Sequence, residues 1–390
     1  MSEKDWGHLT DHGKKALTAL GGYYATYYKS PGNWPSGFNV FLWADVDART
    51  RETAEALKAG FGQQIDLRIA SLPLGAKADP LFHPFKMGCG KPDIGKLQSR
   101  ADDINNHAKA WWAGADHAEA IAQLREVLAC SGRGCTTIDS IPDSAKPCSV
   151  YDEKCSSPLR WEGKFSYAST ATEVFLLEYA NSMPERQVGW GRVAPPNPLA
   201  KAHLSKMLEL HEFYFGKTLR ERYVAQIEGS NLVREIQATL NRQTAGCQRA
   251  PLEYKFVGLV GHDTNLATVG SLLGLRWKFV PPALPAQDAL PGGALVFELR
   301  RIAGTDYVRA VYVTQNPAQI RAAQNDALRL TVGCYGMNGR YHPVCVMPLR
   351  DFNEIVRRVV ATEFLSACVD GKQVCPRPPT AARIKRGKKP

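Results

Sequence analysis

The sequence lacks the features that mark several classes of protein. It has no Cys-x-x-Cys pair and no histidines at zinc-finger spacing, although it has ten cysteines, so we expect neither a metal site nor a cofactor. No apolar run approaches the roughly 20 residues that a membrane-spanning helix needs. There is no internal repeat. These absences argue against a zinc-binding domain, a membrane-spanning protein and a repeat protein.

Acidic charge is missing from the carboxyl end. Residues 376–390 contain six Lys or Arg and no Asp or Glu, so they carry more than half of the net charge of +11 and leave +5 for the rest. Such a tail could bind nucleic acid or anionic lipid. Because it has no interleaved aromatic residues, we expect a solvated, disordered tail and no nucleic-acid or membrane partner.

The cysteines favour disulfides and an oxidising compartment. Their pairing cannot be derived from the sequence, although Cys334 and Cys345 could close a small loop. The first residues, "MSEKDWGHLT", have neither the basic nor the apolar region of a signal peptide. Since a disulfide-rich protein is usually exported, we expect a periplasmic or secreted protein whose natural start is not Met1.

Hydrophobic periodicity predicts an α/β protein. Residues 9–29 have helical spacing with Thr10 or Asp11 as N-cap, "FNVFLWAD" is typical of a buried strand, and "VDARTRETAEALKAGFG" of a helix that ends at glycine. Helical segments dominate 92–250, around a Cys-rich loop at 130–155. "KFVGLVGHDTNLATVGSLLGL" then predicts strand, turn and helix, and "GALVFELRR" with "YVRAVYVTQ" a strand pair.

This order predicts three parts. Residues 1–91 and 251–375 form a discontinuous α/β sheet domain, 92–250 a helical domain, and 376–390 the tail. In open α/β sheets the binding site lies at the carboxyl ends of the strands. Polar residues in the segments that follow the predicted strands are therefore the candidates for a site.

Two segments place polar residues at that edge. In "VGLVGHDTNLA", His262 and Asp263 follow a strand and precede a helix, whose N-terminus favours an anion. Alternatively, Asp263 or Thr264 is only an N-cap. In "WADVDARTRETAEAL", Arg49 could clamp a phosphate or carboxylate, or could instead pair with Asp45, Asp47 or Glu52.

Several segments together resemble the bacterial periplasmic histidine acid phosphatases, in the branch of phytases and glucose-1-phosphatases. They are "ADVDARTRETAEAL", "DPLFHPFKMG", "ATEVFLLEYANSMPE…GWGR", "FVGLVGHDTNLATVGSLLGL", "PGGALVFE" and "LTVGC…C", in order from about residue 6 to 375. The resemblance implies a phosphoglycerate-mutase-like sheet domain with a helical insert, no metal, and a phosphohistidine intermediate. "HDTN" is more typical of the phytases.

The resemblance also implies roles for individual residues. Arg49 would bind the phosphate, His262 would hydrogen-bond a phosphate oxygen, and Asp263 would be the general acid for the leaving alcohol. Glu173 would face the substrate pocket, and Thr264 would lie beside the acid. The implied partner is a small phosphate ester, and we expect a monomer.

The defining motif of this family, a strand ending in Arg-His-Gly-x-Arg-x-Pro, is absent from the chain. His12 in "DHGKK" follows no apolar strand and precedes a helix, so we interpret it as an ordinary helix residue. We expect the nucleophilic histidine upstream of Met1. The missing strand would lie at the centre of the sheet, between "NVFLWAD" and "FVGLVGH", leaving the backbone amides of its neighbours unpaired.

Three functions remain open. The chain is a phosphomonoesterase, a non-catalytic phosphate-binding relative or truncated form without a nucleophile, or, least expected, a nucleic-acid-binding protein acting through its tail. His83 and His211 have no partner at metal-ligand spacing, so we expect them to be packed or surface histidines.

Overall fold

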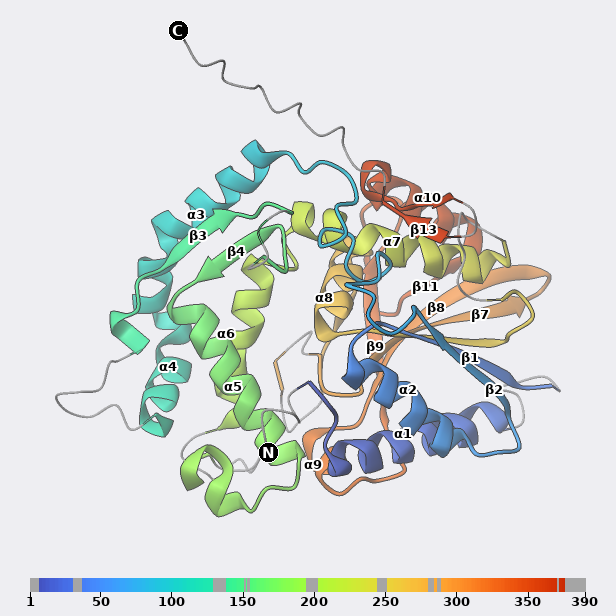
Figure 1. The fold of residues 1–390 in the computed structure, drawn as a ribbon, viewed down its shortest axis with the longest axis horizontal. Helices are drawn as coiled ribbons and strands as arrows, with labels where there is room; N and C mark the ends of the chain where they lie inside the picture. The colour runs from blue at the N-terminus through green and yellow to red at the C-terminus, as the bar shows by residue number, and fades with distance from the viewer. Residues whose placement is uncertain are drawn as a thin grey trace, which may run out of the picture.

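Helices α3 to α6 lie on one side of the molecule and the main sheets on the other in the computed structural model (Figure 1). The structure describes residues 7–30, 37–128, 138–150, 152, 155–193, 203–243, 251–279, 284–285, 289–369 and 372–375. The basic tail at 376–390 lies outside these residues. The fold is the mixed α/β arrangement that the sequence predicts.

The N-terminal segment alternates helices and strands as expected. It contains α1 (Asp11–Lys29), β1 (Asn39–Ala44), α2 (Ala48–Phe61) and β2 (Asp66–Ser71). Thr10 is the N-cap of α1 and accepts a hydrogen bond from the Gly13 amide. Helices α1 and α2 approach so closely that a Cβ on Gly60 would lie 1.9 Å from the Thr18 carbonyl oxygen.

Strand β5 (Phe256–Val260) pairs directly with β1, in a parallel sheet of order β2-β1-β5. The register runs from Val40 opposite Phe256 to Ala44 opposite Val260. The expectation of a missing strand between these two segments is therefore wrong. Parallel neighbours are joined by long crossovers, so sequence order does not fix which strands lie side by side.

A second, larger sheet consists mainly of antiparallel pairs. It contains β6 (Arg276–Trp277), β7 (Ala294–Ile302), β8 (Thr305–Thr314), β9 (Leu328–Tyr335), β10 (Tyr341–His342) and β11 (Val346–Pro348). The predicted pairing of β7 with β8 is confirmed. Ala303 and Gly304 form their two-residue turn with φ of 47° and 80°, which is the backbone that matches the twist of a hairpin.

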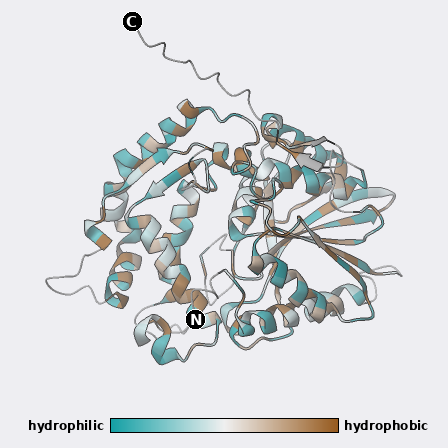
Figure 2. Ribbon diagram, in the orientation of Figure 1, coloured by the Kyte–Doolittle hydropathy of each residue, from teal (hydrophilic) through white to brown (hydrophobic). Residues whose placement is uncertain are grey.

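The helical side contains α3 (Ile94–Ala113), α4 (Ala115–Val127), α5 (Lys164–Ala180) and α6 (Leu204–Lys217), with the hairpin of β3 (Ser144–Pro147) and β4 (Leu159–Glu162). Gly114 separates α3 from α4 within a stretch that the sequence presents as continuous. Figure 2 shows that α3, at the outer edge, is mainly hydrophilic.

The remaining helices pack mainly against other helices. Helix α7 (Arg222–Asn241) contacts α8 (Asp263–Leu272) and α10 (Leu349–Val359), and the short α9 (Pro317–Arg321) contacts α1 and α5. Short 3-10 segments lie at Ile138–Ser140, at Glu185–Gly191, which is kinked, and at Thr362–Phe364. Strand β12 (Ala367–Val369) pairs with β13 (Lys372–Val374). The division into domains stays a prediction.

Three disulfides lie within the described residues, and one of them joins distant parts of the chain. Cys334 pairs with Cys345, as the sequence suggests, and Cys148 pairs with Cys155. A third bond links Cys89 to Cys375, across 286 residues, and so ties the carboxyl-terminal strands to the loop after β2. None of the helices in the described residues is both long and apolar enough to cross a membrane.

Candidate functional site

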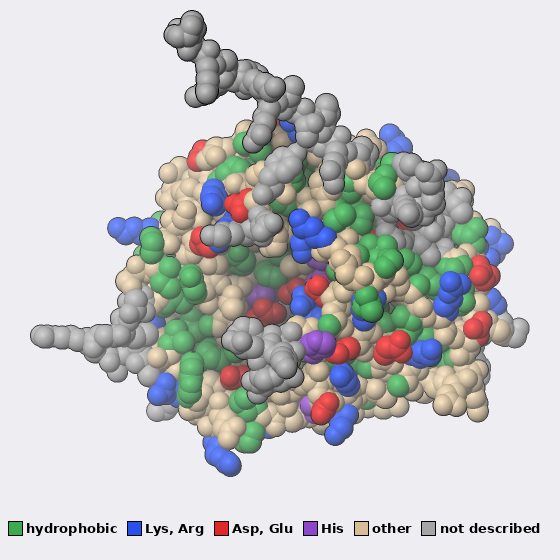
Figure 3. Space-filling view, viewed as in Figure 1, with side chains coloured by type: hydrophobic (Ala, Val, Ile, Leu, Met, Phe, Trp, Pro, Cys, Tyr) green, Lys and Arg blue, Asp and Glu red, His purple; other side chains and the backbone are tan. Residues whose placement is uncertain are grey.

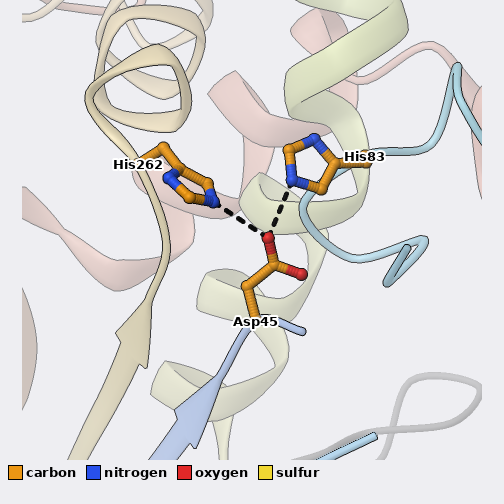
Figure 4. A group of neighbouring side chains, drawn as sticks. All are labelled: Asp45, His83 and His262. Carbon is orange, nitrogen blue, oxygen red and sulfur yellow. Dashed lines mark hydrogen bonds and ion pairs between the residues drawn. The ribbon is translucent and has the colours of Figure 1, made fainter. Parts of the chain in front are cut away.

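Strands β1 and β5 end at the same edge of their sheet, and the residues that follow them meet there (Figure 4). Asp45 follows β1 and is completely buried. One of its carboxylate oxygens, Oδ2, accepts hydrogen bonds from His262 Nε2 at 3.1 Å and from His83 Nε2 at 2.7 Å. His262 follows β5, whereas His83 comes from the loop after β2.

These contacts fix the charge of Asp45. Burial alone would raise the pKa of the carboxyl, but the hydrogen bonds from His262 and His83 outweigh it and hold the pKa well below its usual range. The same contact acts on His83. Burial alone would lower the pKa of His83, but Asp45 raises it overall. Asp45 is therefore an ionised acceptor at every pH at which the protein is expected to work.

Arg49, in the first turn of α2, completes the contacts of His262. Its Nη2 donates a hydrogen bond to His262 Nδ1 at 3.2 Å and lies 3.1 Å from Asp47 Oδ2. An arginine only donates hydrogen bonds, so Nδ1 must carry a lone pair and the ring proton must lie on Nε2. Both ring nitrogens of His262 therefore have a hydrogen-bond partner.

A metal ion does not suit this arrangement. Asp45, His83 and His262 are the one group of side chains in the described residues with ligand atoms close enough together to hold a metal. However, Nε2 of His262 carries the proton that it donates to Asp45, so it offers no lone pair to a cation. The guanidinium of Arg49 on the other ring nitrogen adds a positive charge. The cluster is better suited to binding an anion.

The N-terminus of α8 also points to an anion site. His262 occupies the N-cap position, and its backbone N–H donates to Asn265 Oδ1 at 2.9 Å. The alternative that Asp263 or Thr264 is merely the N-cap is therefore wrong. Asp263 lies in the first turn and accepts from the Thr264 amide at 2.7 Å. The N–H groups of this turn and the helix dipole favour negative charge beside Asp263.

Glu173 and His211 approach the site from helices α5 and α6. Burial raises the pKa of Glu173 to about 7; the negative charge of Asp263 adds to this effect and Arg49 opposes it. His211 is buried, as predicted, with Ser169 Oγ 2.9 Å from its Nδ1. Burial lowers the pKa of His211, although Asp263 opposes this.

These side chains line a cavity of about 1400 Å³, which contains all of the predicted site residues except Thr264. In Figure 3, histidine, acidic and basic side chains gather in a hollow near the middle of the visible face. Thr264 follows Asp263 in the chain but does not line the cavity. No local pattern assigns Asp45 and His83 to the site, because they are 38 residues apart and only the fold brings them together.

His12 lies in the first turn of α1, as expected for an ordinary helix residue. Its Nε2 donates a hydrogen bond to the Ile320 carbonyl oxygen at 2.9 Å. It therefore connects α1 to α9.

The chain matches the model of the histidine phosphatase superfamily (branch 2) over residues 1–313. The chain belongs to this superfamily. Phytase AppA of Escherichia coli (strain K12) is 29% identical over 339 residues, which are 81% of this chain and 73% of that protein. A glucose-1-phosphatase of Providencia rettgeri is 24% identical over 331 residues, 81% of this chain and 74% of that protein.

Solved histidine phosphatases have the same fold. The apo form of a Hafnia alvei phytase has a TM-score of 0.73 and 28% identity, and the match covers 92% of this chain and 88% of that one. The phytase of Citrobacter braakii has a TM-score of 0.72 and 26% identity, with 92% and 89% covered. The resemblance found in the sequence motifs is thus confirmed.

Proposed function

We propose that this protein binds the phosphate group of a small phosphate monoester at the edge formed by β1 and β5, and hydrolyses it. The observation that carries the proposal is the convergence of Arg49, His262 and the N-terminus of α8 beside the carboxyl group of Asp263. Two nitrogen-rich side chains and a helix N-terminus neutralise phosphate oxygens, which is the main requirement of phosphoryl transfer.

Each residue has a part in the proposed reaction. Arg49 clamps the phosphate, His262 hydrogen-bonds one of its oxygens, and Asp263 protonates the leaving alcohol. Thr264 positions the acid, to which it is already hydrogen-bonded through its amide. Glu173 faces the substrate and is neutral below its raised pKa of about 7, so it does not repel the phosphate at acidic pH.

The attacking group of the proposed reaction is a histidine that forms a phosphohistidine intermediate. His262 is a poor candidate, because Arg49 and Asp45 engage both of its ring nitrogens. In this proposal His262 is therefore a ligand of the phosphate and not the attacking group. The same observation favours a second candidate function, namely phosphate binding without turnover.

The substrate class follows from the relatives. They are phytases and glucose-1-phosphatases, and we propose a phytate-like or sugar phosphate as substrate. The disulfides support an oxidising location such as the periplasm or the exterior of the cell.

Two measurements test the proposal. Calorimetric titration with orthovanadate measures binding. Turnover is measured at about pH 5 with two substrates: p-nitrophenyl phosphate, which releases p-nitrophenol, and an alkyl phosphate, which releases inorganic phosphate. We expect Asp263→Asn to leave orthovanadate binding unchanged and to slow hydrolysis of the alkyl phosphate about 10²–10⁴-fold. Hydrolysis of p-nitrophenyl phosphate should slow less, because p-nitrophenol is a good leaving group that needs little help from an acid. Binding without hydrolysis would favour the second function, and absence of binding would contradict both.

A further inference from the structure

Glu173 lines the cavity from helix α5, and its position there is set by the helix. Among the residues that the structure describes, its carboxyl has no hydrogen-bond or ion-pair partner. Two charges act on it from a distance: Asp263 of α8 raises its pKa, and Arg49 of α2 lowers it. His211 of α6, which contacts Ser169 of α5, lines the same cavity. Where Glu173 lies among these groups therefore depends on where the backbone of α5 lies.

The carboxyl end of α5 meets α9 (Figure 1). Arg321 Nη1 of α9 donates a hydrogen bond to the Tyr179 carbonyl oxygen at 2.8 Å, and its Cζ lies 4.8 Å from the centre of the Tyr179 ring. The last carbonyl groups of a helix have no partner within the helix, and a cation beside them interacts favourably with the helix dipole. Arg321 therefore holds the last turn of α5 by a hydrogen bond and by charge.

The two residues that follow α5 bind back to α9 and α1. Ser182 has a φ of 58°, a left-handed backbone that is uncommon for residues other than glycine. Its Oγ donates a hydrogen bond to the Arg321 carbonyl oxygen at 2.6 Å and lies 3.3 Å from His12 Nε2. The Thr10 hydroxyl donates to Asn181 Oδ1 at 2.6 Å. The end of α5 is thus tied to two other helices by side-chain hydrogen bonds.

Apolar contacts close the same region. Ala16 of α1, Ala180 of α5 and Ile320 of α9 form a small buried cluster, in which each residue is at most 5% exposed. Because two of the three side chains are alanines, little apolar surface is buried here, and the hydrogen bonds decide how the helices are aligned. The α5 junction consists of residues 10–16, 179–182 and 320–321.

We propose that Arg321 is a positioning residue of the phosphate site: through the α5 junction it sets how the carboxyl of Glu173 lies relative to Arg49 and Asp263. Tyr179 follows Glu173 by six residues in the same helix, which is about 9 Å along its axis. A displacement at the junction thus reaches the site through less than two turns. Ionised Glu173 opposes an anion, and in this last step the inference rests on the proposed function.

Carbon-13 NMR of the Glu173 carboxyl tests the junction without any phosphate ligand. The glutamate carboxyls of the full chain are labelled, and the signal of Glu173 is the one that Glu173→Gln lacks. We expect Arg321→Gln to lower the midpoint of this titration by about one pH unit, a tenfold change in proton affinity, because a displaced side chain gains water. Arg321→Lys keeps the charge and a donor, and should restore about half of the shift.

Two further variants separate this effect from a general loss of stability. Ser182→Gly adopts the same backbone conformation and removes only the hydroxyl, so it should lower the midpoint by a smaller amount. Arg358→Gln is the matched control, since Arg358 pairs with Glu354 on α10, and should leave the midpoint unchanged. An unchanged midpoint in Arg321→Gln would overturn the proposal, and so would an equal shift in Arg358→Gln. If Arg321→Gln does not fold, an unchanged midpoint in Ser182→Gly would overturn it.

Orthovanadate binding is a separate readout. Its dissociation constant should rise as Glu173 ionises, and in Arg321→Gln this rise should begin about one pH unit lower. Adding Arg321→Gln to Glu173→Gln should leave the profile of Glu173→Gln unchanged, because Arg321 acts through Glu173. If the midpoint moves as expected and orthovanadate does not bind, the positioning role stands and the proposed function fails. If orthovanadate binds and the midpoint does not move, the proposed function stands and the positioning role fails.

Discussion

Asp45 Oδ2 lies 3.1 Å from His262 Nε2 and 2.7 Å from His83 Nε2, so a single buried carboxylate oxygen orients two imidazoles that come from different loops. This relationship holds His262 with its Nδ1 toward Arg49. The geometry of the anion site therefore depends on a residue that does not face the substrate.

Replacing the buried carboxylate should destabilise the protein. We expect Asp45→Asn to lower the free energy of unfolding at pH 7 by about 1–3 kcal/mol, because an amide keeps one acceptor but loses the charge. Because the pKa of Asp45 is lowered on folding, its contribution is present above the unfolded value of about 3.8 and disappears as the pH falls through the folded pKa. Urea denaturation at several pH values measures it.

The control for this variant is Asp103→Asn. Asp103 pairs with His107 and with Arg100 on the surface of α3, where such pairs contribute less than about 1 kcal/mol each. A loss as large as that of Asp45→Asn would show that burial is not the cause.

Glu173 should make substrate binding depend on pH. Its pKa is raised to about 7, so ionisation adds a negative charge beside the phosphate as the pH rises through 7. We expect the dissociation constant of orthovanadate to increase across this range in the unchanged protein, relative to Glu173→Gln. Parallel profiles for the two proteins would contradict the assignment.

Glu173 should also affect stability in the opposite sense to Asp45. A raised pKa means that the protonated form is favoured on folding, so its stabilising effect is present below about pH 4.5 and is lost as the pH rises through 7. The difference from Glu173→Gln should reach about 1–3 kcal/mol above that pH, allowing for partial exposure of the side chain. Thermal unfolding of both proteins between about pH 4 and 8, in steps of about one pH unit, measures this difference.

Arg49 should determine affinity for the anion. Arg49→Gln removes a charged donor and should weaken orthovanadate binding about 10–100-fold, with little change in unfolding because the side chain is exposed. Arg358→Gln is a suitable control, since Arg358 lies on α10 and pairs only locally with Glu354. Calorimetry should find its affinity unchanged.

The disulfide between Cys334 and Cys345 should stabilise the second sheet. It joins β9 to the residue before β11 across 11 residues. The double substitution Cys334→Ser with Cys345→Ser should lower the free energy of unfolding by about 2–3 kcal/mol, from the entropy of an open loop of this length. If a reducing agent destabilises the double variant as much as the unchanged protein, this bond contributes little.

Local patterns in the sequence determined the elements of this protein and part of its site. Thr10 and helical spacing predicted α1, and "FVGLVGHDTNLA" predicted the strand and helix that carry His262 and Asp263, because caps, turns and periodicity act within a few residues. The rule that sites lie at the carboxyl ends of strands also brought Arg49 to the correct edge.

Only the tertiary structure decided which strands are neighbours and what surrounds each charge. It paired β1 with β5 and placed His83 on Asp45. Strand order and pKa depend on contacts between residues that are far apart in the chain, and neither pattern nor propensity records such contacts. The burial that raises the pKa of Glu173 exists only in the folded chain.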